Sequence, residues 1–305
     1  MKKVFLVVLY YKDQKATFEL IETLKDVRKE TFDLHTVIVD NYPQDPIKIN
    51  PSDYKDLNLR VIYNKENLGF SGGNNIGITE SLKNGADFIL ILNNDTLVDP
   101  NFIEELIKVS EDNKNCGIVS PKIYFAKGYE FHKDRYKESD LGKVIWYAGG
   151  AIDWENVIGN HKGLDEVDKG QFDEDGETKM ATGCCFLVKK EVLEKVGLYD
   201  DRYFLYFEDA DFSERVKKAG FKIFYAPKSI IWHKNAQSSG GSGSSLQDYF
   251  TTRNRLIFGY TYAPMRTKIA LFRQSLNLIL KGRPWQRRGI IDFYLGRLGK
   301  GSYRG

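Results

Sequence analysis

The chain has 305 residues, of which 42% are hydrophobic and 29% are charged, and its formal net charge is +3. This composition is ordinary for a globular protein and argues against a disordered or fibrous chain. Three cysteines, two of them adjacent (Cys184 and Cys185), argue against a disulfide framework and favour a reducing, intracellular setting.

Positive charge is concentrated at the C-terminal end of the chain. Residues 264–305 contain ten Lys or Arg and one Asp, a net charge of +9, which leaves −6 for residues 1–263. Apolar residues are interleaved with these cations, which favours peripheral membrane contact over a nucleic-acid-binding arm. A packed helix pair with basic outer faces is the alternative. Either way, we expect 264–305 to be a basic, amphipathic helical extension without a nucleic acid partner.

The first expected element is an apolar strand at 4–10. A signal peptide is less favoured there, because charged residues follow at once and no small-residue cleavage site is present. No stretch of the chain approaches the ~18–20 apolar residues that span a bilayer. Further strands are expected at 36–40, 59–63 and 87–92, and helices at 15–29, 73–84 and 99–112.

Alternation of apolar strands and helices predicts an α/β fold, with a mainly parallel, Rossmann-like sheet flanked by helices. Ligands bind beyond the carboxyl ends of the strands in such sheets. Asp40 and Asp95 both fall at such an end.

The second half of the chain is less regular. Residues 121–180 are rich in aromatic, glycine and acidic residues with weak periodicity, and we interpret them as an irregular or β-rich insertion. A strand is expected again at 183–188. The glycine- and serine-rich segment within 236–247 is interpreted as a mobile loop inside one domain of residues 1–263, although a linker between domains is the alternative.

The glycine-rich segment 67–77, "NLGFSGGNNIG", lacks both the Gly-Lys-Ser/Thr and the G-x-G-x-x-G patterns of nucleotide-binding loops. It is either a tight turn or a binding loop that opens a helix. Asp95 follows an apolar strand, where it either caps a turn or holds a divalent cation together with substrate phosphates. His233 ends a strand pair and gains interest only if it lies near Asp95.

The segment 203–221, "YFLYFEDADFSERVKKAGF", predicts a helix that begins near Glu208. Helical phase places Asp209 on the inward stripe, whereas Asp211 and Arg215 are spaced as a solvated ion pair. The aromatic residues before Asp209 are expected to raise its pKa and suit it to act as a base. Stabilisation of the helix N-terminus is an equal alternative for Asp209 and a role for Glu208.

Taken together, several segments resemble family-2 glycosyltransferases of the GT-A fold, especially the bacterial rhamnosyltransferase-like branch. The resemblance covers about residues 4–260. The matching segments are "VIVDN" (37–41), "NLGFSGGNNIGI" (67–78), "LILNNDT" (90–96), "GCCFLVKKEVLEKVGLYDDRYFLYFEDADFSERVKKAGFKIFYAP" (183–227), "IIWH" (230–233) and "YFTTRN" (249–254).

The resemblance implies inverting transfer of a sugar from a nucleotide-diphosphate donor, with Mg²⁺ or Mn²⁺ as cofactor. Asp209 matches the catalytic base and Glu208 its acidic neighbour. Asp95 takes the last position of the D-x-D metal motif, and His233 matches a histidine that helps to hold the metal. Donor and nucleotide binding is expected at Asp40, Asn67, Gly69, Gly73, Asn74, Asn94, Arg253 and Asn254.

Two positions depart from the family pattern. Tyr11 stands where relatives often have Asn after the first strand, which leaves part of the nucleotide recognition open. Asn93 occupies the first Asp position of D-x-D, so that Asp95 carries the metal role with less help. Relatives in this branch often have the same Asn, so inactivation does not follow from it.

The expected function is therefore sugar transfer, with rhamnose as one candidate, to a saccharide or lipid-linked saccharide in cell-surface polysaccharide synthesis. We expect the protein at the cytoplasmic face of the membrane. One alternative is a non-catalytic GT-A module that binds saccharide or assembles a complex. A sugar-phosphate nucleotidyltransferase is less favoured, because "YYKDQKAT" follows the first strand in place of a basic, glycine-rich loop.

Overall fold

The computed structural model describes residues 1–235 and 243–304. The large sheet contains β1 (Lys2–Tyr10), β2 (Phe32–Asp40), β3 (Leu59–Tyr63), β4 (Phe88–Asn93), β5 (Thr96–Val98), β6 (Cys116–Phe125), β7 (Ile145–Tyr147), β10 (Gly176–Thr178), β11 (Cys185–Lys189) and β12 (Lys222–His233). A separate hairpin is formed by β8 (Gly150–Asp153) and β9 (Ile158–His161).

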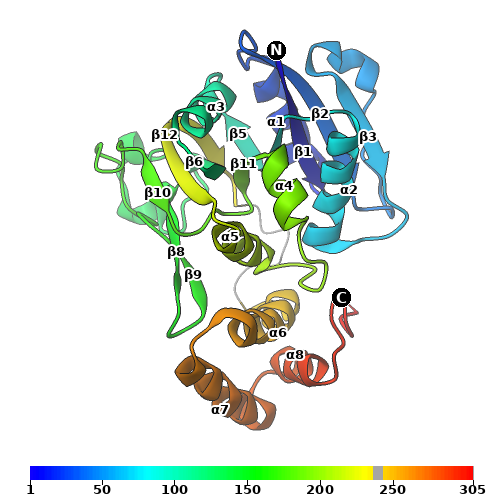
Figure 1. Cartoon of the computed structure of the whole chain (residues 1–305), viewed down its shortest axis with the longest axis vertical. Coiled ribbons are helices and arrows are strands. Elements are labelled where there is room, and N and C mark those ends of the chain that lie inside the picture. Colours follow the sequence, from blue (N-terminus) through cyan, green and yellow to red (C-terminus); the bar gives the residue numbers. More distant parts are fainter. Residues whose placement is uncertain (236–242, 305) are drawn as a thin grey trace.

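The helices are distributed along the whole chain (Figure 1). They are α1 (Gln14–Lys25), α2 (Gly69–Lys83), α3 (Phe102–Asp112), α4 (Lys190–Val196), α5 (Glu208–Lys218), α6 (Ser245–Tyr262), α7 (Met265–Lys281) and α8 (Pro284–Tyr294). Short 3-10 segments are η1 (Pro51–Leu57), η2 (Lys133–Arg135) and η3 (Glu138–Asp140).

The sheet is mixed but mainly parallel. Strands β3, β2, β1 and β4 lie side by side in parallel, β11 is antiparallel between β4 and β6, and β12 runs parallel to β6. Tyr10 pairs with Asp40, and Leu9 pairs with Asn93. The register therefore brings the polar residues after β2 and β4 to the same edge of the sheet, as the sequence predicts.

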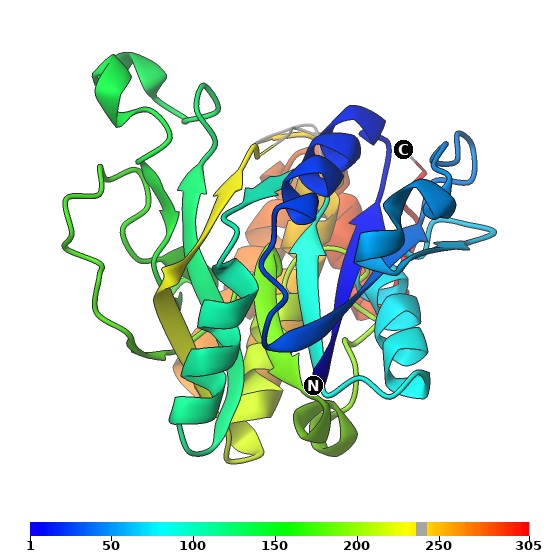
Figure 2. The same ribbon diagram turned by 90° about the horizontal axis from the view of Figure 1, so that it is seen from above.

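Alternation along β1 divides the core into two layers. Val4, Leu6 and Val8 face a cluster to which α1 and α3 contribute, whereas Phe5 and Val7 face a cluster with residues of α2, α4 and α5. Figure 2 shows helices on both sides of the sheet. Because both faces are covered, each inner strand is apolar along most of its length.

Helix α2 begins at Gly69, four residues before the predicted start at residue 73. Gly69 has φ +74°, and a Cβ atom there would lie 2.4 Å from the carbonyl oxygen of Phe204. At Gly73 a Cβ would lie 2.4 Å from Cδ1 of Leu9. The glycines therefore let this helix pack closely on β1 and on the segment before α5.

The region predicted as an insertion is β-rich, but its first five residues belong to β6, which runs through Phe125. Strand β10 also joins the large sheet, beside β12. Of the strands in this region, β8 and β9 form a separate hairpin, which extends toward α6 and α7 (Figure 1). The insertion thus connects the sheet with the C-terminal helices.

The C-terminal helices pack on the domain through α6. Leu271 of α7 and Ile290 of α8 are buried in a cluster with Leu256, Ile257 and Phe258 of α6. Most of the loop predicted at 236–247 lies outside the described residues, and 245–247 form the first turn of α6. None of the helices in the described ranges has the length and hydropathy needed to cross a membrane.

Candidate active site

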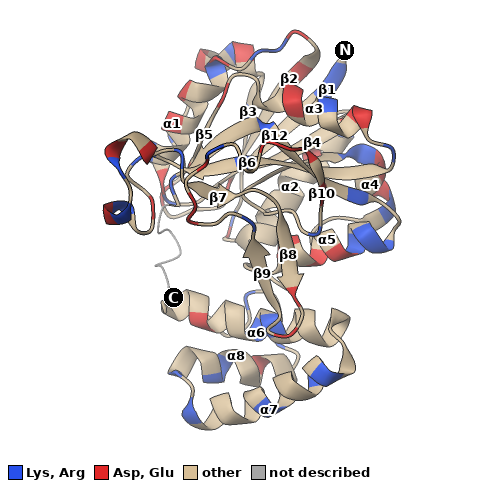
Figure 3. Cartoon of the chain, turned by 90° about the vertical axis from the view of Figure 1, so that its left-hand side faces the viewer, with Lys and Arg blue, Asp and Glu red and all other residues tan. Residues whose placement is uncertain are grey.

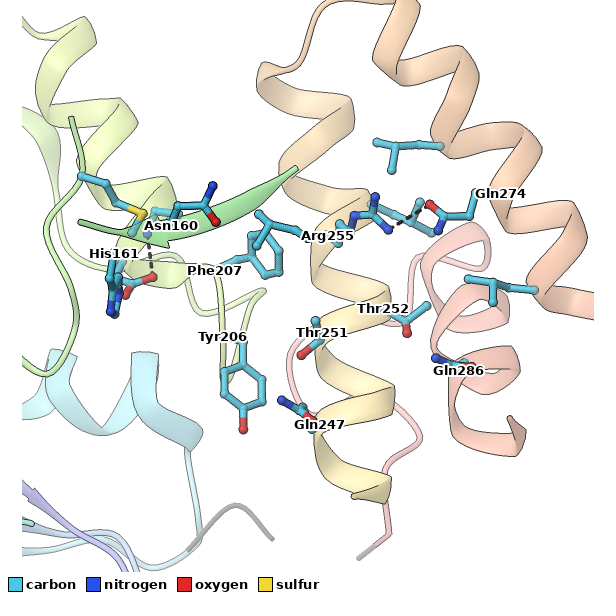
Figure 4. A pocket seen from close by; sticks show the side chains of 18 of the residues that line it. Asn160, His161, Tyr206, Phe207, Gln247, Thr251, Thr252, Arg255, Gln274 and Gln286 are labelled. Carbon is cyan, nitrogen blue, oxygen red and sulfur yellow. Dashed lines mark hydrogen bonds between the residues drawn. The ribbon is translucent and has the colours of Figure 1, made fainter. Parts of the chain in front are cut away.

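A cleft of about 880 Å³ lies between the start of α5, the hairpin β8–β9 and helices α6 to α8. Its walls are aromatic, apolar and neutral polar (Figure 4). Among the described lining residues, only Asp209 and Arg255 carry a formal charge at neutral pH if histidine is neutral. Aromatic faces together with neutral hydrogen-bonding groups suit a sugar, which has both apolar faces and hydroxyls.

Asp209 lies in the first turn of α5 and is partly exposed to this cleft. Its Oδ2 accepts a hydrogen bond from the Gly183 N–H at 2.9 Å, and Oδ1 accepts one from the Ala210 N–H at 2.8 Å. Burial raises the pKa of this carboxyl despite these hydrogen bonds. Asp209 thus occupies the helix start and also faces a ligand-sized space, so the two roles considered from sequence are compatible.

The aromatic segment before Asp209 has an unusual backbone. Phe204, Tyr206 and Phe207 have φ angles of 64°, 70° and 72°. This left-handed conformation costs roughly 1–2 kcal/mol for each non-glycine residue. Tyr206 and Phe207 line the cleft, so strain is concentrated directly beside the base candidate.

Arg253 and Asn254 of α6 hold this strained segment from behind. The Asn254 side-chain amide donates to the carbonyl oxygens of Tyr203, Leu205 and Tyr206 at 2.7–2.9 Å. The Arg253 guanidinium donates to Arg202 O at 3.2 Å and to Tyr203 O at 3.1 Å. We call Arg253 and Asn254 the α6 clamp.

Both clamp side chains are fully buried. In this structure they position residues 202–206, a role that the sequence did not indicate. The predicted contact of Arg253 and Asn254 with the diphosphate stays a prediction.

Glu208 points away from solvent. It is 5% exposed, and its Oε2 atom has no hydrogen-bond partner among the described residues. Burial, reinforced by the neighbouring Asp209 carboxylate, raises the pKa of Glu208 well above its usual value. A neutral Glu208 beside Asp209 avoids placing two adjacent negative charges in a buried environment.

The predicted pair between Asp211 and Arg215 forms, with Arg215 Nε 2.7 Å from Asp211 Oδ2, but its predicted solvation is wrong. Asp211 is 3% exposed. The hydroxyl of Tyr262 donates a hydrogen bond to Asp211 Oδ1 at 2.8 Å, and the hydroxyl of Tyr203 donates to the same oxygen at 3.4 Å. Helical spacing revealed the pair, but burial comes from α6 and the aromatic segment packing over α5.

Asp95 and His233 are brought together as the metal hypothesis requires. His233 Nε2 lies 3.2 Å from Asp95 Oδ1, and both residues are buried. Adjacent ligands of an octahedral Mg²⁺ lie about 3 Å apart, because each bond is roughly 2.1 Å long. The donor set of one carboxylate and one imidazole therefore fits a divalent cation that takes its other ligands from substrate and water.

The groups around the pair bear on its charge. No group of three or more His, Cys, Asp or Glu residues suited to a metal occurs in the described ranges. Burial by itself lowers the pKa of the His233 imidazole, but Cys184 and Asp95 outweigh it and raise this pKa well above normal. Because a metal binds only the neutral imidazole, the proton and the metal compete for His233.

The metal candidates and the base candidate are linked through two short segments. Gly183 N–H donates to Asp209, and the next residue, Cys184, accepts a hydrogen bond from Asn93 N–H at 2.9 Å. Trp146 lines the cleft, and its ring centroid is 4.6 Å from that of His233. Asp95 and His233 do not line the cleft that contains Asp209, but they are joined to its wall through the Trp146 ring.

Asp40 is buried, and its carboxylate accepts hydrogen bonds from Tyr42 N–H at 2.9 Å and Ile47 N–H at 2.7 Å. The carboxylate therefore shapes the loop after β2 in this structure. Contact of Asp40 with the nucleotide base or ribose stays a prediction.

Asn41, which the sequence analysis did not select, connects the loops of this edge. Its side chain bonds to Asn67 Oδ1, Gly69 O, Asn64 Nδ2 and Leu68 N at 2.9–3.1 Å. Its place beside Asp40 in "VIVDN" was the available signal.

The other predicted donor residues are divided between two places. Asn67 and Gly69 join the Asn41 network, and Gly73 lies directly against it. Asn74 is buried and donates to Phe70 O within α2. Asn94 donates to Thr17 Oγ1 at 2.9 Å, at the start of α1, away from the Asn41 network.

Comparison with known proteins identifies the family. Residues 6–197 match the model "Glycosyl transferase family 2". The chain is 27% identical over 192 residues to the low-salt glycan biosynthesis hexosyltransferase Agl10 of Haloferax volcanii, covering 63% of this chain and 57% of the relative. It is 24% identical over 196 residues to an N-acetylglucosaminyl-diphospho-decaprenol L-rhamnosyltransferase of Mycobacterium tuberculosis, covering 62% of each.

The chain therefore spans about 60% of the length of these relatives. Among solved structures, GalNAc-T7 with UDP, GalNAc and Mn²⁺ superposes with a TM-score of 0.59 at 14% identity. This match covers 91% of the present chain and 55% of the other. The predicted GT-A fold is confirmed by these similarities.

Proposed function

The chain belongs to glycosyl transferase family 2, and from this premise we propose that it is a metal-dependent inverting glycosyltransferase with Asp209 as general base. Use of a nucleotide sugar in glycan synthesis follows from the family. The observation that carries the finer proposal is Asp209 itself, a carboxylate of raised pKa that faces an otherwise nearly uncharged cleft.

In the proposed reaction an acceptor hydroxyl enters the cleft and gives its proton to the Asp209 carboxylate. The acceptor oxygen forms a bond to the anomeric carbon of the donor sugar. The bond from this carbon to the nucleotide diphosphate breaks, and its electron pair leaves with the diphosphate. Because attack and departure occur on opposite sides, the configuration inverts. One base suffices for this transfer, whereas glycoside hydrolysis needs two cooperating carboxylates.

Asp95 and His233 are the residues that would hold Mg²⁺ or Mn²⁺, with the donor diphosphate supplying further oxygen ligands. When bound, the cation neutralises charge on the departing diphosphate. The nucleotide is proposed to lie along residues 40–74, where the Asn41 network fixes the loops. Rhamnose is one candidate sugar, supported by the name of the mycobacterial relative.

The acceptor is proposed to be a saccharide on a lipid, reached at the cytoplasmic face of a membrane. Helix α7 supports this through an outer row that is 48–74% exposed, namely Met265, Ile269, Phe272, Leu276 and Leu280. This row follows one helical face over about 22 Å, at 1.5 Å per residue. Basic residues occur along the same helix (Figure 3), which suits anionic lipid headgroups.

The transferase hypothesis is tested by Asp209→Asn in the full chain. A panel of nucleotide sugars is first screened with Mg²⁺ or Mn²⁺ by thermal shift, and transfer is then measured. We expect kcat to fall about 10²–10⁴-fold while the donor still stabilises the protein. Glu214→Gln, on the same helix but paired with Lys217, is the control. Unchanged turnover in Asp209→Asn would disprove the base role.

A non-catalytic saccharide-binding or assembly module makes a different prediction for the same panel. It would give neither transfer nor donor hydrolysis with any sugar nucleotide, even in the wild-type chain. The pH dependence separates the models further. Since the pKa of Asp209 is raised, transfer should increase with pH until its carboxyl is deprotonated and then level off.

The membrane hypothesis is tested with vesicles of phosphatidylglycerol and phosphatidylcholine. Replacing Phe272 and Leu276 by Ser removes apolar area from the outer row of α7 and should weaken sedimentation with anionic vesicles at least about tenfold. Ile76→Ser, at an exposed position of α2, is the control. Equal sedimentation of all three proteins would refute docking through α7.

A further inference from the structure

Arg255 is a cation in the cleft with neutral hydrogen-bond partners. It projects from α6 on the same row as Gln247 and Thr251, and it points toward Gln274 of α7 (Figure 4). Its Nε donates to Asn156 O at 2.7 Å, and one terminal nitrogen donates to Gln274 Oε1 at 2.9 Å. Across the described ranges, no carboxylate forms an ion pair with it.

The surroundings of Arg255 compensate its charge only in part. Burial lowers the pKa of the guanidinium, and the opposing influence of Asp153 is smaller. The Asp153 carboxylate accepts hydrogen bonds from residues 155 and 156 of its own hairpin turn. A partly desolvated cation without an anionic partner is costly, and an incoming anion would offset that cost.

We propose that Arg255 binds a phosphate group of the acceptor, so that the acceptor is a saccharide joined to its lipid through a phosphate or diphosphate. This inference rests on the proposed transferase function and specifies its acceptor. The planar guanidinium can donate two parallel hydrogen bonds to phosphate oxygens. Gln274 and the Asn156 carbonyl hold the guanidinium in place for that contact.

The rest of the cleft agrees with such a ligand. Leu271 and Leu278 of α7 line it beside Gln274, so apolar surface is available next to the cation. These residues lie on the same helix whose outer row is proposed to contact the membrane. The donor diphosphate is expected elsewhere, at Asp95 and His233 in the turn between β4 and β5 and at the end of β12.

The subsite is tested by calorimetric binding of farnesyl diphosphate to the full chain, since this probe carries a diphosphate and an isoprenoid but no sugar. Arg255→Gln should weaken binding at least about tenfold, the loss typical of hydrogen bonds to a charged group. Arg273→Gln removes an equal charge from the exposed side of α7 and should bind like the wild type. Arg255→Lys keeps the charge but not the paired donors of the guanidinium, so its affinity should lie between those of Arg255→Gln and the wild type.

Three further ligands decide which diphosphate is recognised. Farnesol, which lacks phosphate, should bind weakly and equally to wild type and Arg255→Gln. UDP and dTDP should bind both proteins equally and should not displace farnesyl diphosphate. Displacement by either nucleotide would assign Arg255 to the donor, and unchanged probe binding in Arg255→Gln would refute the subsite.

Failure of this inference differs from failure of the transferase proposal. If the subsite is wrong, sugar transfer persists while the probe does not depend on Arg255. If the chain is not a transferase, no sugar is transferred although the probe still binds through Arg255. Circular dichroism and the melting temperature of each variant confirm that the comparison is made between folded proteins.

Discussion

The polar side chains of residues 40–74 form hydrogen bonds with other groups of the protein. The polar side chains that line the cleft beside Asp209 face the open space of that cleft. At the end of β2, Asp40 and Asn41 form hydrogen bonds with the neighbouring loops. In the cleft, Asp209 remains partly exposed and Arg255 lacks an anionic partner in the described ranges. The difference agrees with a proposed donor side whose polar groups already bond to one another and a proposed acceptor side whose polar groups are open to a ligand.

The largest expected effect on stability is on the proposed donor side. Asp40→Ala leaves the N–H groups of Tyr42 and Ile47 without their acceptor, and each unsatisfied buried group costs about 1–3 kcal/mol. We expect the free energy of unfolding to fall by about 3 kcal/mol in urea titrations. Asp45→Ala, at an exposed site in the same loop, should stay close to the wild type. A similar loss in both variants would break the comparison, because the loop would then not depend on the Asp40 carboxylate.

The next effect is expected from the α6 clamp, on catalysis as well as on stability, because three buried hydrogen bonds are removed. Asn254→Ala removes three hydrogen bonds from residues 203–206, so the strained backbone beside Asp209 should relax. A misplacement of about 1 Å can cost up to about 100-fold in rate, so we expect kcat to fall about 10–100-fold with little change in donor KM.

Thr261→Ala, at the exposed end of the same helix, is the control for Asn254→Ala. Hydrogen exchange of residues 203–207 should accelerate in Asn254→Ala alone. If exchange there is unchanged while kcat falls, Asn254 would act on the ligand directly, and the contrast between the two regions would need revision.

The smallest effect is expected from Glu208→Gln, which replaces the buried carboxyl next to Asp209. The raised pKa means that folded Glu208 keeps a proton that the unfolded chain has lost. Stability is therefore lost as pH rises from the ordinary Glu value, about 4.3, through the raised folded value. Glutamine is always neutral, so the variant should melt a few degrees higher at pH 8 and equally at pH 4. A lower melting temperature at pH 8 would show that the charged form is stabilised.

Much of the fold could be predicted from the sequence because apolar strands alternate with helices over residues 4–112. The register between β1 and its neighbours then places the ends of β2 and β4 together, which the parallel arrangement predicts. The early start of α2 was missed because glycines usually mark a turn, whereas here they permit close contact with β1. That contact joins residues distant in the chain, so the sequence around the glycines contains no pattern that reveals it.

Part of the geometry of the candidate site could also be predicted. Helical phase placed Asp209 toward the interior, and the pairing of Asp95 with His233 agrees with their proposed shared role. The burial of Asp211 could not be predicted, since the covering Tyr262 belongs to another helix. Arg255 was missed for the same reason: only the folded chain shows that its partners are neutral.

The α6 clamp also bears on how the protein becomes active during its synthesis. Residues 203–207 leave the ribosome before Arg253 and Asn254, and without these two side chains the left-handed backbone of Phe204, Tyr206 and Phe207 is unfavourable. We therefore expect a nascent or nicked chain that ends before α6 to lack an oriented base. Catalytic competence would then arise only after the helix that also carries Arg255 has docked, so that an incomplete chain does not consume activated sugar.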